Sequence, residues 1–277
     1  MSVTIFQAVL LGIVQGLTEF LPVSSTVHLA LAQHFLPGFS QPGILFDVML
    51  HVGTLVAVVI YFRERLLATA LGLFASDAGA KRAAWRLVLL LGLSVAMTGA
   101  IAMPLKKLAV EGMTNFRRMG FALLGTAILL TIAQLVGIRR GGGGRSLDEV
   151  RPVDSALVGL FQAFSAVLHG LSRSGNTISV GLFTGLSRKA AAEYSFLLSI
   201  PTILAAAAVE NLHAFRQGET IMSAGSFPAY ATGMLVAGVV GYLAVAVLLR
   251  LIINMKLLPF AVYCATLGLI LVIRPPA

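Results

Sequence analysis

The sequence predicts an all-α polytopic integral membrane protein, and both its composition and its apolar runs indicate this class. Hydrophobic residues make up 58% of the 277 residues and charged residues only 11%, whereas a soluble domain carries about 25% charged residues. Seven apolar runs are close to the ~20 residues that a helix needs to cross a bilayer. These features exclude a water-soluble enzyme, a disordered chain and a coiled coil. The one cysteine, Cys264, lies in an apolar run and is interpreted as a packing residue.

The apolar runs divide the chain into membrane spans and polar hairpins. The runs cover residues 3–21, 44–62, 87–105, 119–138, 190–209, 228–249 and 257–273. The stretches 23–36, 153–168 and 171–186 hold too many Ser, Thr, His, Arg and Gly residues to face lipid. Polar backbone survives at membrane depth only where protein buries it or where it lines a wet cavity. We therefore expect re-entrant helical hairpins, one in each half of the chain, and about six transmembrane spans. A count in which the hairpins are full spans is the alternative.

The chain divides into two similar halves joined by a basic, glycine-rich linker. Residues 139–152 begin with two arginines and four glycines, and no Gly-Lys-Ser/Thr follows. This segment is therefore a linker and not a phosphate-binding loop. A shift of 147 residues places Gln15 on Gln162 within a weak but ordered repeat. We expect halves at 1–138 and 153–277, each a re-entrant hairpin plus three spans. An odd number of spans would invert the second half relative to the first, as in many transporter folds.

The basic residues predict the orientation in the membrane. The net charge is +9, which in a membrane protein indicates loops that face anionic lipid and not a nucleic-acid partner. If the spans alternate, thirteen of the 20 Lys and Arg residues lie on one side and six on the other, and Arg173 lies inside a hairpin. The positive-inside rule puts the thirteen in the cytoplasm, so both termini are expected outside.

The first hairpin carries a carboxylate among polar neighbours. Gln15 and Glu19 are four residues apart and share a helix face, and Pro22 bends or ends that helix. The turn and the next helix then supply hydroxyls and an imidazole, from Ser24, Ser25, Thr26 and His28. A carboxylate at membrane depth costs several kcal/mol unless it is paired or functional.

The second hairpin carries a guanidinium at the start of a small-residue helix. Residues 172–177 read Ser-Arg-Ser-Gly-Asn-Thr. Arg173 offers a planar fork for phosphate oxygens, and the new helix adds N–H donors and a positive dipole end. If the hairpins meet, carboxylate and amide suit Mg²⁺ or Ca²⁺ held with substrate phosphates, and the set fits phosphoryl transfer. Alternatively, the small polar residues only pack the helices, and Arg173 pairs with Glu19 structurally.

Two long motifs in this order resemble those of a known family, the undecaprenyl-diphosphate phosphatases, also called bacitracin-resistance proteins. The family's first motif, Glu/Gln-x-x-x-Glu followed by Phe-Leu-Pro-Val-Ser-Ser-Thr-x-His, matches residues 15–28. Its second motif, Pro-Gly-x-Ser-Arg-Ser-Gly-x-Thr, matches residues 170–177. Segments 46–55 and 191–201 are also similar to family signatures, so the resemblance covers nearly the whole chain.

The resemblance implies a function and a role for each motif residue. It implies removal of the terminal phosphate from a C55 isoprenyl diphosphate, which regenerates the lipid carrier for cell-wall synthesis. The enzyme would lie in the bacterial cytoplasmic (inner) membrane, with its active site facing the outer side. Glu19 and Gln15 are the implied metal-binding pair, Ser25 the implied nucleophile and His28 its acid or base, while an activated water in place of the serine stays open. The implied binding residues for the diphosphate are Arg173, Ser172, Ser174 and Thr177, with Ser24 and Thr26 beside them.

Some positions depart from the family pattern. Gln15 stands where glutamate is also found, which removes one charge from the metal site. Val27 replaces a usual glycine, His169 a usual proline and Asn176 a small residue. We interpret His169 as a residue that fills the hairpin, and a titratable group near the site is the alternative.

A second hypothesis is a lipid-phosphate transporter or flippase for polyprenyl phosphate. Inverted halves and broken helices favour it, and so does the pair Asp47 and His51, four residues apart on one apolar helix, as a proton relay. The simpler interpretation is an intrahelical pair where Asp47 starts the span. A homodimer is left open.

Overall fold

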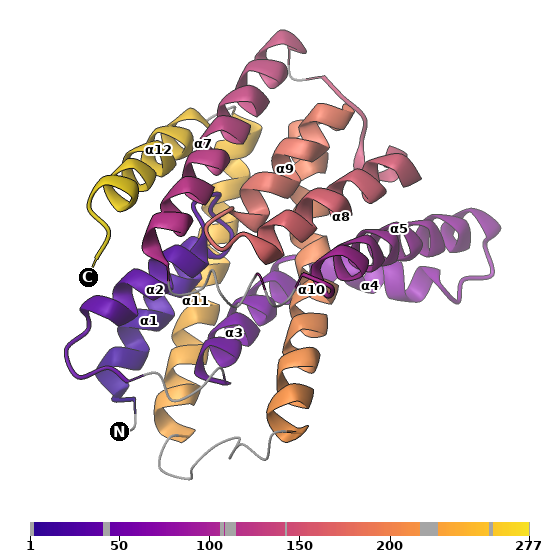
Figure 1. Ribbon diagram of the computed structural model, residues 1–277. Helices are drawn as coiled ribbons and strands as arrows, with labels where there is room; N and C mark the ends of the chain where they lie inside the picture. Colours follow the sequence, from indigo (N-terminus) through magenta and orange to yellow (C-terminus); the bar gives the residue numbers. More distant parts are fainter. Residues whose placement is uncertain are drawn as a thin grey trace.

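The structure, a computed structural model, describes residues 3–40, 45–105, 108, 115–141, 143–216, 227–254 and 257–276. Within these ranges the chain is almost entirely helical, and its β structure is an isolated bridge between Arg145 and Leu186. The all-α prediction is confirmed. The helices in Figure 1 are α1 (Ile5–Thr18), α2 (Ser25–Phe35), α3 (Leu45–Tyr61), α4 (Arg63–Gly72), α5 (Ala78–Ala102), α7 (Phe116–Arg139), α8 (Pro152–Val167), α9 (Arg173–Thr184), α10 (Arg188–Arg216), α11 (Phe227–Ile253) and α12 (Leu258–Ile273), with the 3-10 turn η1 (Leu147–Glu149) before α8.

Several helices of the described part are long and apolar enough to span a membrane. Four qualify alone, namely α5, α7, α10 and α11. A fifth span results if α3 and α4, bent by 74° at Phe62, count as one. A polytopic membrane protein is therefore confirmed. The predicted count of about six also included α12, which at 16 residues is shorter than these.

Two helices begin where the sequence analysis did not expect a helix to begin. Helix α4 lies in a segment that the sequence analysis left as a loop, and its mean hydropathy is low because Arg63, Glu64 and Arg65 lie in its first turn. Helix α5 begins nine residues before the predicted run at 87, because Asp77 caps it by accepting from the Ala80 N–H at 2.7 Å. A good cap starts a helix even where the first turns are charged and exposed, so hydropathy alone misses its beginning.

Helix–turn–helix hairpins occur where the sequence predicts them. In the first, α1 ends before Pro22 and α2 begins after Ser24. In the second, α8 begins with Pro152 at its first position, and α9 begins at Arg173. The side chain of Ser172 accepts a hydrogen bond from the Gly175 N–H at 3.2 Å and so caps α9. That these hairpins are re-entrant stays a prediction.

Each hairpin packs against a long helix of the other half. Helix α1 lies along α11, and α8 lies along α5 (Figure 1). A Cβ at Gly12 would lie 2.7 Å from the carbonyl oxygen of Gly233, and a Cβ at Gly159 would lie 2.4 Å from that of Ser94. The shift of 147 residues pairs these two glycines. Equivalent contacts are what an internal repeat produces, and the inverted repeat with its boundaries remains a prediction.

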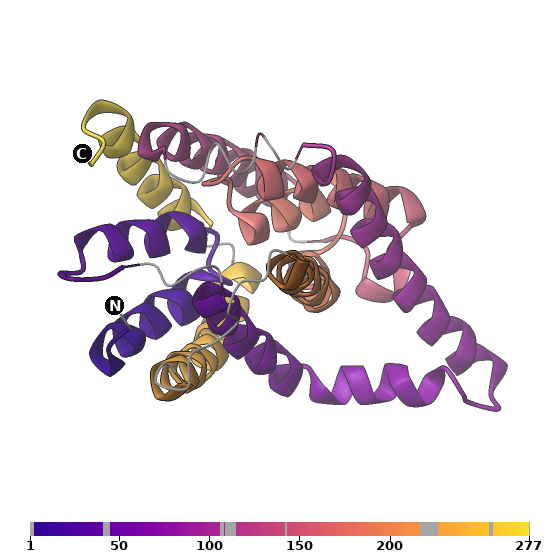
Figure 2. The ribbon, with the colours of Figure 1, turned by 60° about the horizontal axis from the view of Figure 1, so that its bottom comes forward.

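Helix α10 joins the two halves at the centre. Figure 2 looks almost along this helix, which contacts α3, α5, α9 and α11. The buried Tyr194 donates a hydrogen bond to the Leu90 carbonyl at 2.9 Å, and its hydroxyl lies 2.8 Å from that of Ser94 and 2.9 Å from that of Ser155. On the opposite side Phe196 meets Phe20 edge to face at 5.8 Å. These contacts fix both hairpins against one rigid helix.

The linker arginines bind the end of the second hairpin. Arg145 forms two hydrogen bonds with the Asp154 carboxylate, at 2.5 and 2.9 Å, and Arg140 donates to the carbonyl oxygens of Leu182 and Phe183. The last carbonyls of a helix lack intrahelical partners, and basic side chains satisfy them. The linker therefore ties α8 and the C-terminal end of α9 together.

We predict that Gly159→Ala destabilises the protein. Its new methyl group would lie 2.4 Å from the backbone oxygen of Ser94 on α5, so the two helices must separate. Overpacking of this kind costs about 1–3 kcal/mol, which a thermal unfolding curve of the purified protein in detergent measures as a lower midpoint. The matched control is Gly92→Ala on α5, whose Cβ would meet nothing within 4 Å. Equal midpoints for the two variants would contradict this description of the α5–α8 contact.

Candidate active site

Glu19, at the turn after α1, is the centre of the site. Its carboxylate is buried, and its Oε1 forms an ion pair with Nη2 of Arg173. Its Oε2 accepts hydrogen bonds from Gln15 Nε2 at 2.9 Å and from Ser25 Oγ at 2.7 Å. The Nε2 atom of His51 lies 3.6 Å from the same oxygen. Groups from both hairpins and from α3 therefore converge on one carboxylate.

The turn that carries Ser25 has an unusual backbone. Ser24 has a φ of +69°, in a region that only glycine adopts easily. Such a conformation costs on the order of 1 kcal/mol and persists where neighbours hold it. His28 Nδ1 lies 2.8 Å from the Ser24 carbonyl oxygen. Because a carbonyl oxygen only accepts, Nδ1 donates here. The imidazole thus holds the turn that aims Ser25 at Glu19.

His28 points toward α12 and not toward Glu19. Its Nε2 lies 2.6 Å from the hydroxyl of Tyr263, and the two rings stack with centroids 5.6 Å apart. The adjacent Cys264 is buried, as the sequence predicts, and its thiol donates to the Pro22 carbonyl at 3.4 Å. Both ring nitrogens of His28 therefore have partners outside the space next to Glu19. Its role as acid or base for Ser25 stays a prediction.

Arg173 lies at the first turn of α9 and reaches across to the first hairpin. Its Nη1 is buried and has no hydrogen-bond partner among the described residues. Besides the ion pair with Glu19, the hairpins are joined by a neutral hydrogen bond, in which Ser174 Oγ donates to the Leu21 carbonyl at 3.1 Å. The hydroxyls of Thr177 and Ser195 lie 2.6 Å apart, deeper in the protein. An unpaired guanidinium N–H beside a helix N-terminus is a donor set for a phosphate oxygen.

A cavity of about 190 Å³ opens beside the Glu19–Arg173 pair. It is lined by a subset of the residues that the sequence analysis selected, namely Glu19, Ser24, Ser25, Thr26, Ser172 and Arg173. Four other selected residues are not in its lining, namely Gln15, His28, Ser174 and Thr177. Gln15 lies behind Glu19, and the other three hold the backbone of the hairpins. Six of the selected residues thus face the cavity, and the other four hold these six in place.

Other lining residues were missed as site residues from the sequence. His51 lines the cavity, and its Nδ1 lies 2.8 Å from the backbone carbonyl of Asp47. This contact uses the main chain of Asp47, and the proton-relay hypothesis stays untested. Gln162 Nε2 donates to Thr98 Oγ1 at 2.9 Å and to Thr202 Oγ1 at 3.2 Å. The repeat was the available signal, since it pairs Gln162 with Gln15.

The positions that depart from the family pattern have local explanations. Val27 is fully buried in the core. Asn176 Nδ2 donates to Ser165 Oγ at 2.9 Å and to the Phe161 carbonyl, and so joins the two arms of the second hairpin. His169 is half-buried at the hairpin tip, beside α7. It does not line the cavity next to Glu19.

The residues around Glu19 suit a cation that substrate phosphates help to hold. The Oε1 atom of Gln15 is buried and has no hydrogen-bond partner among the described residues, and the Glu19 carboxylate and the Ser25 hydroxyl lie beside this amide. Within the described chain no group of three or more His, Cys, Asp or Glu side chains could hold a metal ion. Mg²⁺ is often bound by one or two carboxylates plus substrate phosphates. The donor set therefore fits a partial site that the substrate completes.

Comparison with known proteins confirms the family resemblance over nearly the whole chain. The family model described as bacitracin resistance protein BacA matches residues 8–270. An "Undecaprenyl-diphosphatase" of Syntrophotalea carbinolica is 41% identical over 94% of this chain and 95% of its own length. One from Treponema denticola is 38% identical over 96% of each chain, and an "Undecaprenyl-diphosphatase 2" of Stutzerimonas stutzeri is 37% identical over 97% of each. The chain belongs to the bacitracin resistance protein BacA family.

Proposed function

We propose that this protein is an undecaprenyl-diphosphatase. It removes the terminal phosphate of a C55 isoprenyl diphosphate within the membrane and leaves the lipid monophosphate and inorganic phosphate. The observation that carries the proposal is the convergence of Glu19, Ser25 and Arg173 beside one cavity. The names of the three relatives support the same substrate. The product recycles the lipid carrier for cell-wall synthesis.

The diphosphate binds at the second hairpin. The unpaired Nη1 of Arg173 donates to a phosphate oxygen, and the N-terminal end of α9 adds backbone N–H groups and its positive dipole. The hydroxyls of Ser172 and Thr26 also line the cavity and supply further donors. Phosphoryl transfer depends mostly on positioning and on neutralising charge. Arg173 provides both, because its Nη1 binds the substrate while its Nη2 stays on Glu19.

Ser25 attacks the terminal phosphorus. The Oγ–P bond forms while the bond from that phosphorus to the bridging oxygen breaks, and the lipid monophosphate leaves with the bond's electron pair. The Ser25 proton passes to Glu19 Oε2, which already accepts its hydrogen bond at 2.7 Å. A water then attacks the phosphoserine, releases inorganic phosphate and restores the serine. A divalent cation held by Glu19 and Gln15 would supply charge neutralisation at the phosphate oxygens.

The chain is a multi-pass membrane protein, and its placement in the cell is part of the proposal. We place it in the bacterial cytoplasmic membrane, with both termini and the cavity on the outer side. The excess of Lys and Arg in one set of loops supports this orientation. A homodimer stays open. The names of the relatives do not support the transporter alternative, since they describe a diphosphatase.

We predict that charge removal at the hairpin contact abolishes most activity. Arg173→Gln should lower kcat/KM at least about a thousandfold, because the arginine neutralises phosphate charge in the transition state. Arg173→Lys should recover about tenfold over Arg173→Gln, since lysine keeps the charge but not the fork. Phosphate release from C55 diphosphate by purified protein in detergent measures this. Lys189→Ala, which removes an exposed ammonium group near the half-buried Glu193, is the control that should match the wild type. Full activity in Arg173→Gln would discard the site.

Ser25→Ala should lower kcat at least about a thousandfold, as loss of a nucleophile does. The matched control is Thr26→Ala, which removes a hydroxyl that lines the cavity without a hydrogen bond to Glu19, and which should lose less than about tenfold. Acid quenching with a labelled terminal phosphate should trap phosphoserine in the wild type only. Turnover by Ser25→Ala, without any trapped intermediate in the wild type, means that water attacks directly.

Chelation should stop phosphate release, and added Mg²⁺ or Ca²⁺ should restore it, because the phosphates and the Glu19 carboxylate share the cation. Gln15→Ala should raise the cation concentration for half-maximal rate about tenfold, since it removes one neutral oxygen ligand. Direct binding of Mn²⁺, followed by its paramagnetic resonance signal, gives a readout besides activity. A rate unaffected by chelator would remove the cation from the proposal.

A further inference from the structure

An apolar groove lies directly behind Ser172 and Arg173, which we call the phosphate clamp because they are proposed to hold the diphosphate. It has a volume of about 430 Å³ and runs between α7 and the tip of the α8–α9 hairpin. Its apolar walls are Phe121, Ala122 and Gly125 on one side and Val167, Leu168 and Leu171 on the other. Leu171 also lines the cavity beside Glu19. The groove and the catalytic cavity therefore share one side chain as their common wall.

The hairpin tip lies flat on α7, and Gly125 leaves the space. Thr126 Oγ1 accepts a hydrogen bond from the Ser172 N–H at 3.0 Å, and a Cβ at Gly170 would lie 2.5 Å from the Met119 carbonyl oxygen. These contacts bring the two backbones close together. At Gly125, by contrast, a Cβ would meet only Leu171, at 3.5 Å from its Cδ1. The missing side chain thus keeps the groove open beside the wall of the cavity.

The groove opens on a face of α7 that we expect lipid to cover. Phe121 is 58% exposed and Leu168 is 47% exposed, and α7 is one of the helices long enough to span the membrane. The polar residues among those lining the groove are Arg118 and His169. The other lining residues are apolar, so an apolar chain fits the space along them. Because lipid is as apolar as such a chain, the groove favours it through close van der Waals contact and not through removal of surface from water.

We propose that this groove binds the first isoprene units of the polyprenyl diphosphate. The tail then leaves the cavity past Leu171. Ser172 and Arg173, the next residues along the chain, hold the diphosphate on the cavity side of the hairpin turn. This inference rests on the proposed function, since the occupant is its substrate. It adds that chain recognition belongs to the contact between α7 and the second hairpin.

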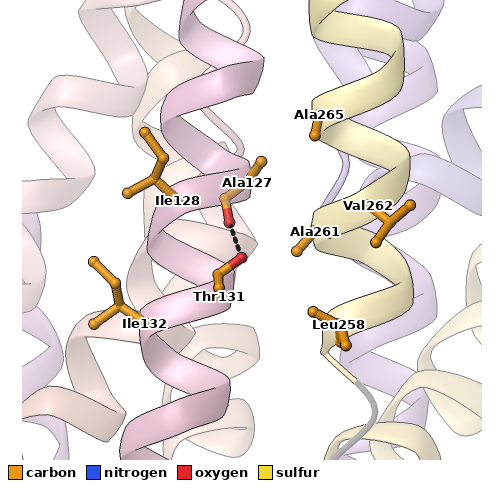
Figure 3. Close-up of a pocket in the computed structure, with 8 residues that line it drawn as sticks. All are labelled: Ala127, Ile128, Thr131, Ile132, Leu258, Ala261, Val262 and Ala265. Carbon is orange, nitrogen blue, oxygen red and sulfur yellow. Dashed lines mark hydrogen bonds between the residues drawn. The ribbon is translucent and has the colours of Figure 1, made fainter.

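A second apolar groove provides the control. It has a volume of about 330 Å³, lies between α7 and α12 (Figure 3), and has no lining residue in common with the catalytic cavity. Its polar side chain, Thr131, donates its hydroxyl to the Ala127 carbonyl at 2.8 Å, as Figure 3 shows. Since this groove does not adjoin the catalytic cavity, a substitution such as Ala265→Leu should leave the KM for the substrate unchanged.

The test fills each groove and measures steady-state kinetics in mixed detergent micelles. The variants are Gly125→Leu at the floor, Leu168→Trp at the mouth and the control Ala265→Leu, each assayed with C55 diphosphate and with dimethylallyl diphosphate, which has a single isoprene unit. Both groove variants should raise KM for the C55 substrate about tenfold, because the larger side chain takes the space of the tail, with kcat within about twofold. The short substrate reaches only the beginning of the groove with its single unit, so its KM should rise less than about twofold in both variants. Ala265→Leu should match the wild type with both substrates.

Each other outcome has a defined meaning. An unchanged KM for the C55 substrate in both groove variants overturns the proposal, because the tail then leaves elsewhere. A fall in kcat that is equal for the long and short substrates also overturns it, since it reports damage to the Thr126–Ser172 contact. If the wild type releases phosphate from neither substrate, the proposed function itself fails.

Discussion

The ion pair between Glu19 and Arg173 is the interaction on which the rest of the site depends. The two residues are 154 positions apart and come from the turns of different hairpins. Two charges taken out of water are stable only if they are paired and their remaining atoms are hydrogen-bonded. Gln15 and Ser25 complete Glu19, whereas Nη1 of Arg173 stays without a partner among the described residues. The carboxylate oxygens therefore have their hydrogen-bond partners, whereas the guanidinium group keeps one N–H free for a phosphate oxygen.

The remainder of the fold holds these two turns face to face. Each hairpin begins with a helix that packs, through a glycine, on a long helix of the other half. Helix α12 fixes the first turn through Tyr263 and Cys264, and α7 fixes the second through Thr126. Backbone contacts of this kind leave little freedom at the tips. A polar site can then exist at membrane depth because protein, and not lipid, surrounds it.

Local sequence patterns predicted the helices and the hairpins well. Pro22, the Ser172 cap and the apolar runs act within a few residues, so their effects follow from the sequence alone. The motif resemblance selected six of the fifteen residues that line the cavity, all of them in the two hairpin turns or directly after them. The partners of His28 and Glu19 could not be predicted in the same way. Tyr263 is 235 positions from His28, and His51 reaches Glu19 only because α3 and α1 pack side by side.

The same limit explains the beginning of α5, the presence of α4 and the groove behind the clamp. Hydropathy does not register the Asp77 cap or a polar helix such as α4. The groove depends on an absent side chain, Gly125, which faces a residue of the other half. Such features arise from tertiary contacts, and a single sequence without relatives carries no signal for them.

The most direct measurement of the central claim is a double-mutant cycle on phosphate release, with Glu19→Gln, Arg173→Gln and the double variant. If both residues serve one diphosphate site, they act as a unit, and the double variant should be hardly slower than the slower single one. Losses in kcat/KM that multiply, as for two independent positions, would contradict the account.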